Sequence, residues 1–118
     1  MTIRAPAVAR LFYPDDPQQL HNEVQQLLAE NPQQGARPKV LVVPHAGYPY
    51  SGPVAARAFN LLRPWAEQIE RVVLLGPSHQ VALSGLALSD ADSFETPLGC
   101  IDLDVEAMSV LGDLEQVA

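Results

Sequence analysis

The chain has 118 residues, of which 47% are hydrophobic and 18% charged, and its formal net charge is −7. This composition is typical of a single folded globular domain and argues against a disordered tail. No apolar run approaches the ~20 residues that a membrane-spanning helix needs, and the first residues lack the apolar core of a signal peptide. We therefore expect a cytoplasmic protein with no membrane partner.

The negative charge is concentrated in the second part of the chain. Residues 1–71 hold all seven basic residues and six acids, whereas residues 72–118 hold eight acids and no base. A surface of that sign repels nucleic acid, and no cluster of Lys and Arg with interleaved aromatics occurs, so we expect no nucleic-acid partner. The acidic stretch is either a solvated face or a surface that a basic segment or partner covers.

A helix over residues 17–30 is the first predicted element. Asp16 and Pro17 are suited to its N-cap and first position, and apolar residues then recur on one face at Leu20, Val24, Leu27 and Leu28. After a polar loop, Val40–Val43 forms a continuous aliphatic run. Such a run is typical of a strand buried on both faces of a parallel sheet.

The following segments predict a parallel crossover. Ser51 is placed to cap a helix that Pro64 ends, and Arg71–Leu75 is a second buried-strand run, so residues 40–75 read as strand, helix, strand. A third strand is expected at residues 83–88, a short fourth at Cys100–Ile101 after a turn, and a last helix from Asp104 through Leu111. We predict an α/β fold with a central, mainly parallel sheet flanked by helices.

Two histidines follow the two predicted strands. His45 comes two residues after the first strand and His79 four residues after the second. Ligands bind at the carboxyl ends of parallel strands, and neighbouring strands lie ~4.8 Å apart, so both imidazoles could reach one metal ion. Taken singly, each is more simply a surface or hydrogen-bonded loop residue. Their matched placement makes His45 and His79 the candidate metal ligands and catalytic residues.

Polar and small residues near the histidines suggest a ligand site. Tyr48 and Tyr50 offer hydroxyl donors or stacking faces, although packing would explain them equally well. Gly52 allows close backbone approach, while Ser51 and Ser78 stand at a helix start and a rigid turn. These five residues form the predicted substrate-binding group for a small aromatic or anionic ligand. Ser78 is not interpreted as a nucleophile activated by the neighbouring His79, because the side chains of adjacent residues in an extended loop tend to point apart.

Five motifs together carry a family resemblance. They are Phe12-Tyr13-Pro14, Pro44-His45-Ala46-Gly47-Tyr48, Tyr50-Ser51-Gly52, Gly76-Pro77-Ser78-His79 and Thr96-Pro97-Leu98-Gly99. In order and spacing they resemble the Memo family, which includes the AmmeMemoRadiSam system protein B proteins. One departure is Arg10-Leu11, where the family usually has Gly-Ser. The resemblance runs over essentially all 118 residues, which would then be one Memo-like domain corresponding to the N-terminal half of the full family domain.

The resemblance implies a fold similar to that of class III extradiol dioxygenases and a non-heme iron site. It assigns His45 and His79 as ligands of Fe²⁺, with another divalent metal as the alternative. The family's late cysteine ligand and its Glu-His-Ser region have no counterpart here, since Cys100 stands in a different motif and is interpreted as a small buried hydrophobe. A partner chain or second protomer would then complete the site.

Three functions remain open from the sequence. The first is a Memo-like iron protein with oxidoreductase activity of the dioxygenase type, for which two ligands alone make activity doubtful. The second is a non-catalytic module that binds phosphotyrosine-type or other anionic or aromatic ligands, as the resemblance also implies. The third is a truncated homologue without activity.

Overall fold

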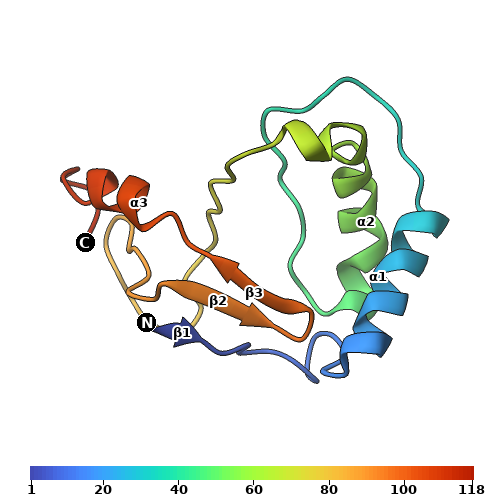
Figure 1. The fold of residues 1–118 in the computed structure, drawn as a ribbon, viewed down its shortest axis with the longest axis horizontal. Helices are drawn as coiled ribbons and strands as arrows, with labels where there is room; N and C mark the ends of the chain where they lie inside the picture. Colours follow the sequence, from blue (N-terminus) through green and yellow to red (C-terminus); the bar gives the residue numbers. More distant parts are fainter. The chain divides into compact units, whose positions relative to one another are not determined.

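The computed structural model describes all 118 residues, which form two compact units. Ala7–Val72 contains helices α1 (Pro17–Glu30) and α2 (Tyr48–Asn60) and the 3₁₀ helix η1 (Arg63–Gln68) (Figure 1). Met1–Pro6 and Val73–Ala118 together contain strands β1 (Ile3–Arg4), β2 (Ser93–Thr96) and β3 (Gly99–Asp102) and helix α3 (Val105–Leu111). The expected mixture of helices and strands is confirmed. No helix has both the length and the apolar character needed to cross a membrane.

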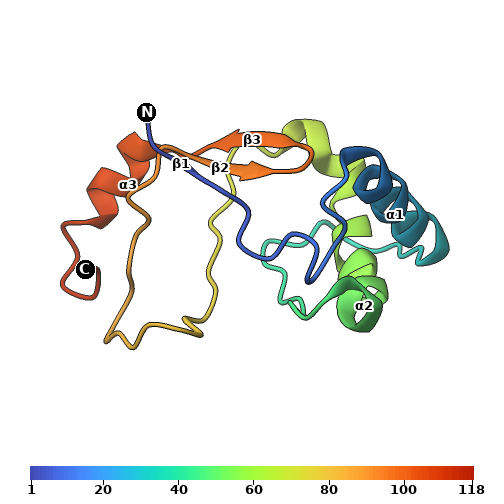
Figure 2. The same cartoon turned by 90° about the horizontal axis from the view of Figure 1, so that it is seen from below.

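Helices α1 and α2 pack side by side in the unit Ala7–Val72, which we call the helical unit, as both views show (Figures 1 and 2). The bounds of α1 are those predicted, and a carboxylate oxygen of Asp16 accepts a hydrogen bond from the Gln19 amide at 2.9 Å. Leu20 of α1 and Ala56 of α2 are buried. A Cβ added to Gly52 would lie 3.0 Å from Leu27 Cδ1, so glycine permits the close approach of the two helices.

The start of α2 differs from the prediction. The helix begins at Tyr48 with Gly47 as N-cap, so Ser51 is a helical residue and not the cap. The Ser51 hydroxyl donates a hydrogen bond to the Ala46 carbonyl at 2.8 Å. The side chain therefore bonds back to the residue before the N-cap instead of capping the helix itself. The helix ends at Asn60, four residues before Pro64, which lies in the first turn of η1 instead of closing α2. Proline is tolerated there because the first turn of a helix leaves its N–H groups unpaired.

The other unit, Met1–Pro6 with Val73–Ala118, is called the sheet unit, and its strand order is β1-β2-β3. Strand β1 pairs with β2 in parallel, with Ile3 opposite Ser93, while β2 and β3 form an antiparallel hairpin with Glu95 opposite Cys100. The hydroxyl of Thr96 closes the turn by accepting from the Leu98 amide and donating to the Gly99 carbonyl, both at 3.1 Å. The predicted short strand at Cys100–Ile101 is confirmed within β3, but a mainly parallel sheet is not, because one of the two pairings is antiparallel.

Three predicted strands are wrong. Residues 40–43 and 71–75 form no strand, and within 83–88 only Leu86 makes an isolated bridge, to Val117. An aliphatic run becomes a strand only where a neighbouring backbone accepts and donates its hydrogen bonds, and residues 40–43 and 72–75 make no such backbone hydrogen bonds. The last predicted helix is confirmed as α3, whose N-cap Asp104 accepts from the Ala107 amide at 3.0 Å.

Candidate functional site

Two of the sequence motifs meet in the helical unit. The amide of Tyr48 donates to the Phe12 carbonyl at 2.8 Å, and the rings of Tyr13 and Tyr48 lie with centroids 5.6 Å apart. The preceding turn is closed by Arg10, whose amide donates to the Tyr13 carbonyl at 2.7 Å and whose φ is 73°. The Phe12-Tyr13-Pro14 segment is therefore held against the start of α2.

A pocket of about 440 Å³ lies next to this contact, entirely within the helical unit. Its wall comes from the 8–13 segment, the inner faces of α1 and α2, and the residues that precede α2. The lining is largely apolar and aromatic, including Val8, Phe12, Val24, Leu27, Leu28 and Phe59. The lining also includes residues with polar side chains, namely Tyr13, His45, Tyr48 and Ser51. An apolar pocket with a few polar groups is the usual form of a small-molecule site.

The hydroxyl of Tyr48 is kept in its neutral form. Burial raises the pKa of Tyr48 above its ordinary value, and negative charge on Tyr13 and on Glu23 raises it further. Both effects disfavour the phenolate. Tyr48, one of the residues that line the pocket, therefore stays a phenol, which can donate a hydrogen bond as well as accept one, up to a higher pH than an ordinary tyrosine.

The predicted site residues fall into three places. His45, Tyr48, Ser51 and Gly52 all line the pocket. Tyr50 is 85% exposed and lies outside it. Ser78 and His79 belong to the sheet unit, in a loop where the Ser78 hydroxyl donates to the Val81 carbonyl.

Sequence reasoning missed most of the pocket wall. The sequence indicates Phe12 and Tyr13 only as part of a motif and Leu27 only as a residue of a helix face. It does not single out Phe59. Two sequence features could have indicated this wall: the Phe12-Tyr13-Pro14 motif and the apolar face predicted for residues 17–30. Both need an apolar surface to pack against, and the same surface could serve both.

The metal-ligand inventory is short. No three His, Cys, Asp or Glu side chains form a group that could hold a metal ion. Cys100 lies exposed on β3, so its interpretation as a buried hydrophobe is wrong. Strand β3 is at the edge of the sheet, so one of its sides has no neighbouring strand. The Cys100 thiol is exposed there.

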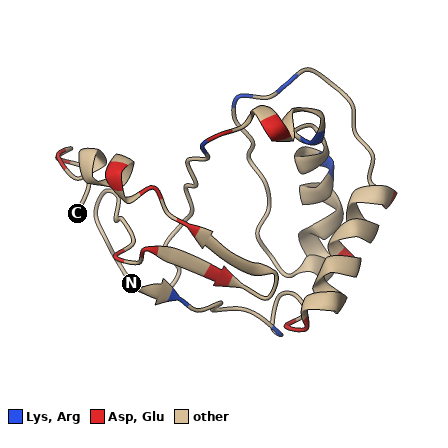
Figure 3. Ribbon diagram, viewed as in Figure 1, with Lys and Arg blue, Asp and Glu red and all other residues tan.

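Acidic side chains dominate the sheet unit. Figure 3 shows Asp and Glu along β2, β3 and α3, and the only Lys or Arg of this unit is Arg4 on β1. The Arg4 guanidinium lies 5.4 Å from the centroid of the Phe94 ring. The positive charge of Arg4 thus lies over an aromatic ring of the same sheet. The sheet unit holds eight acidic residues and this one basic residue.

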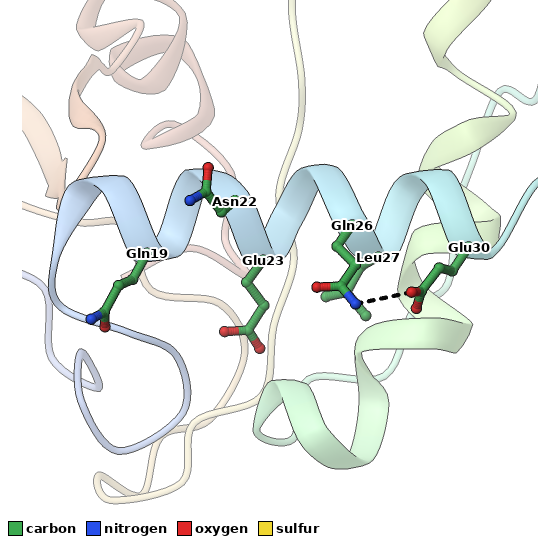
Figure 4. A pocket seen from close by; sticks show the side chains of 6 residues that line it. All are labelled: Gln19, Asn22, Glu23, Gln26, Leu27 and Glu30. Atoms are coloured by element: carbon green, nitrogen blue, oxygen red, sulfur yellow. Dashed lines mark hydrogen bonds between the residues drawn. The ribbon is translucent and has the colours of Figure 1, made fainter.

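A second hollow runs along α1 and carries no predicted site residue. Its side chains come from a single helix and are Gln19, Asn22, Glu23, Gln26, Leu27 and Glu30 (Figure 4). Gln26 donates to Glu30 at 2.9 Å across one turn. Such side chains one turn apart are usual on a solvated helix face. The pocket beside His45 is therefore the candidate site.

Comparison with known proteins relates the chain to one family. A family model described as "Memo-like protein" matches residues 4–118. The curated "MEMO1 family protein" of Aquifex aeolicus is 39% identical over 106 residues, which cover 90% of this chain and 38% of that protein. The corresponding proteins of Methanopyrus kandleri and Methanocaldococcus jannaschii are 36% and 38% identical, each over 92% of this chain and 41% of the relative. The chain thus spans about two fifths of the length of these relatives.

Proposed function

Because this chain belongs to the Memo-like family, we propose that it is a metal-binding protein that takes a small aromatic or anionic ligand in the pocket beside His45. The observation that supports the proposal is the placement of His45, Tyr48 and Ser51 around one apolar pocket. Aromatic walls suit the face of a ring, and the hydroxyl and imidazole groups suit its polar substituents.

The proposed metal is Fe²⁺, with His45 and His79 as its protein ligands. Imidazole suits iron, zinc and copper alike, so the donors fit in kind. They do not fit in number, because no third His, Cys, Asp or Glu joins either histidine in a metal-binding group. We therefore derive no reaction step through the ion. A remaining ligand would come from a second protomer or from a polypeptide outside these 118 residues, and dioxygenase-type chemistry is proposed only for that completed site.

Metal content after anaerobic purification tests the iron proposal. The wild-type chain is compared with a His45→Ala/His79→Ala variant and with His21→Ala, which removes an exposed histidine from α1. We expect iron in the wild type and in His21→Ala, and much less in the double variant. Parallel loading with Zn²⁺ and Cu²⁺ identifies another divalent metal. Equal, low iron in all three proteins would reject this part of the proposal.

Metal-independent ligand binding is the second candidate function. It is favoured by the pocket itself, whose largely apolar lining includes the polar residues His45, Tyr48 and Ser51. Isothermal titration with catechol and with phosphotyrosine, each with and without EDTA, separates the two candidates. Binding that survives EDTA and is weakened by Tyr48→Phe supports the metal-independent module, while no heat with either compound rejects the pocket as a binding site.

A further inference from the structure

Four basic side chains gather on one surface of the helical unit. Arg57 belongs to α2, Arg63 is the first residue of η1, and Arg37 and Lys39 belong to the loop that follows α1. Figure 3 shows Lys and Arg along this loop and at the adjoining end of α2. All four residues are exposed, and we call them the basic surface.

Two contacts hold the loop against the helices. A Cβ added to Gly35 would lie 3.2 Å from Leu61 Cδ2, so the loop packs closely on the end of α2. Two residues later, the Arg37 guanidinium lies over the Trp65 ring in η1. Arg57 stands one turn before Leu61 on the same side of the helix. The loop, the end of α2 and η1 therefore present their bases together.

The charges of the basic surface are not neutralised within the chain. The chain has 14 acidic and 7 basic residues, yet no carboxylate lies within ion-pair distance of the four bases. Glu67 and Glu70 follow Arg63 closely in the sequence and pair with none of them, whereas Arg10 does pair with Asp15. A concentration of unpaired charge of one sign attracts ligands of the opposite sign.

Arg37 is already oriented for binding. Its guanidinium lies 5.6 Å from the centroid of the Trp65 ring, which is within the range of a cation–π interaction. A guanidinium that rests on a ring keeps the N–H donors of its own plane available, and these match the two oxygens of a carboxylate. Because the side chain is held in place, less conformational freedom is lost when a ligand binds.

We infer that the basic surface binds an acidic segment of a partner protein. Arg57 and Arg63 are six residues apart on successive helical turns, which is roughly 9 Å at the rise of a helix, so no single small anion contacts both. An extended peptide advances about 3.3 Å per residue and spans that distance when acids recur at every third position. None of the four bases lines the pocket beside His45, so the inference does not depend on the proposed function.

Large polyanions are poorer partners for this surface. The whole chain carries a net charge of −7, and residues 72–118 hold eight acids without a base, so nucleic acid and anionic membranes are repelled over most of its surface. A short peptide responds mainly to the charges beside it, because the screening length at physiological ionic strength is about 8 Å. The partner is therefore a local acidic segment.

Titration with a designed peptide tests the inference. The full 118-residue chain is added to a short fluorescent peptide with glutamate at every third position, and to the same peptide with glutamine in those places. At low salt we expect saturable binding of the glutamate peptide by fluorescence anisotropy, weakened as salt is raised, and no binding of the glutamine peptide. Trp65 is the only tryptophan of the chain, so its emission should change over the same range with unlabelled glutamate peptide.

Two charge-matched double variants locate the contact. Arg37→Gln/Arg57→Gln and Arg4→Gln/Arg10→Gln each move the net charge from −7 to −9 at exposed positions. The first should weaken binding by about five- to twentyfold, because it removes two exposed ion pairs with the peptide. The second should weaken it less than twofold, although Arg4 also lies over an aromatic ring, that of Phe94. Circular dichroism checks that both variants are folded.

Three results would overturn the inference. They are no anisotropy change with the glutamate peptide at low salt, equal weakening in the two double variants, and equally tight binding of a DNA duplex or of anionic vesicles. The last result would identify a surface for polyanions instead of an acidic peptide. Neither metal nor catechol is present in the titration, so its outcome is separate from that of the proposed function.

Discussion

Arg10 holds a backbone conformation that suits glycine. Its φ of 73° lies in the left-handed region, which costs a residue with a Cβ roughly 1–2 kcal/mol. The side chain returns little, since its contact with Asp15 is 3.6 Å long and both partners are largely exposed. The turn is retained because the Arg10 amide and the Phe12 carbonyl tie the segment to Tyr13 and Tyr48.

We expect Arg10→Gly to stabilise the helical unit by about 0.5–1 kcal/mol, the relieved strain less the extra flexibility of glycine in the unfolded chain. Chemical unfolding followed by circular dichroism of the helices measures the change. Leu11→Gly is the control, because Leu11 has no positive φ and should gain nothing. Equal or lower stability of Arg10→Gly than of Leu11→Gly would show that the turn is not strained.

Ionisation of Tyr48 should lower the free energy of unfolding at alkaline pH. Burial and the nearby Tyr13 and Glu23 raise its pKa in the folded chain, so the fold favours the neutral phenol. The resulting stabilisation is fully present below the unfolded-state pKa of about 10 and is lost as the pH rises through the higher folded-state pKa.

Absorbance at 295 nm should therefore show a tyrosine component that titrates later in the folded chain than in urea. Tyr48→Phe should remove this late component and flatten the fall in unfolding free energy at alkaline pH. Tyr50→Phe, at an exposed position, should leave the late component in place. A late component that persists in Tyr48→Phe would contradict the assignment.

At the scale of elements, a single side chain joins the end of α1 to α2. The buried amide of Asn60 donates to the Leu28 carbonyl at 2.9 Å and to the Asn31 carbonyl at 2.8 Å. The Asn31 side chain in turn donates to the Leu27 carbonyl at 2.8 Å. The last carbonyls of a helix have no partner within the helix, so these bonds satisfy groups that burial would otherwise leave unpaired.

Asn60→Ala should cost about 1–3 kcal/mol of unfolding free energy, because it leaves two carbonyls without their donor. Asn60→Asp should cost at least as much, since a carboxylate cannot donate to a carbonyl. The control is Asn22→Ala on the exposed face of α1, where Asn22 only accepts from Gln18 and the change should stay within about 0.5 kcal/mol. Urea unfolding curves of the three variants provide the comparison, and an Asn60→Ala curve that matches that of Asn22→Ala would contradict the role.

The sequence predicted best the elements whose signals are local. Asp16 and Asp104 cap helices at the expected positions, because a cap depends on neighbours three residues away. Strand predictions at residues 40–43 and 71–75 failed, because a strand needs a partner that composition does not supply. Strand β2 was missed although the turn that follows it was recognised. In the candidate site, His45 and Tyr48 were found from their motif, but the wall opposite them comes from residues far away in the sequence.

At the scale of the whole molecule, charge and apolar exposure oppose one another. A net charge of −7 keeps copies apart, while the runs at residues 40–43 and 72–75 offer them apolar edges to share. Salt weakens only the first effect, since at about 1 M ionic strength the screening length falls to about 3 Å. The chain alone should therefore be monodisperse at low salt and associate non-specifically as salt is raised.

Two double variants that add the same charge at different places can separate charge repulsion from apolar attraction. Val42→Lys/Val73→Lys and Gln33→Lys/Gln34→Lys each move the net charge from −7 to −5 at exposed positions. If repulsion alone controlled association, both double variants would associate more than the wild type. We expect the valine variant to associate less at high salt, because lysines interrupt the apolar edges, and the glutamine variant to associate more. Light scattering against salt concentration measures this, and an identical rise in both variants would show that net charge, not the aliphatic runs, governs the solubility of the chain.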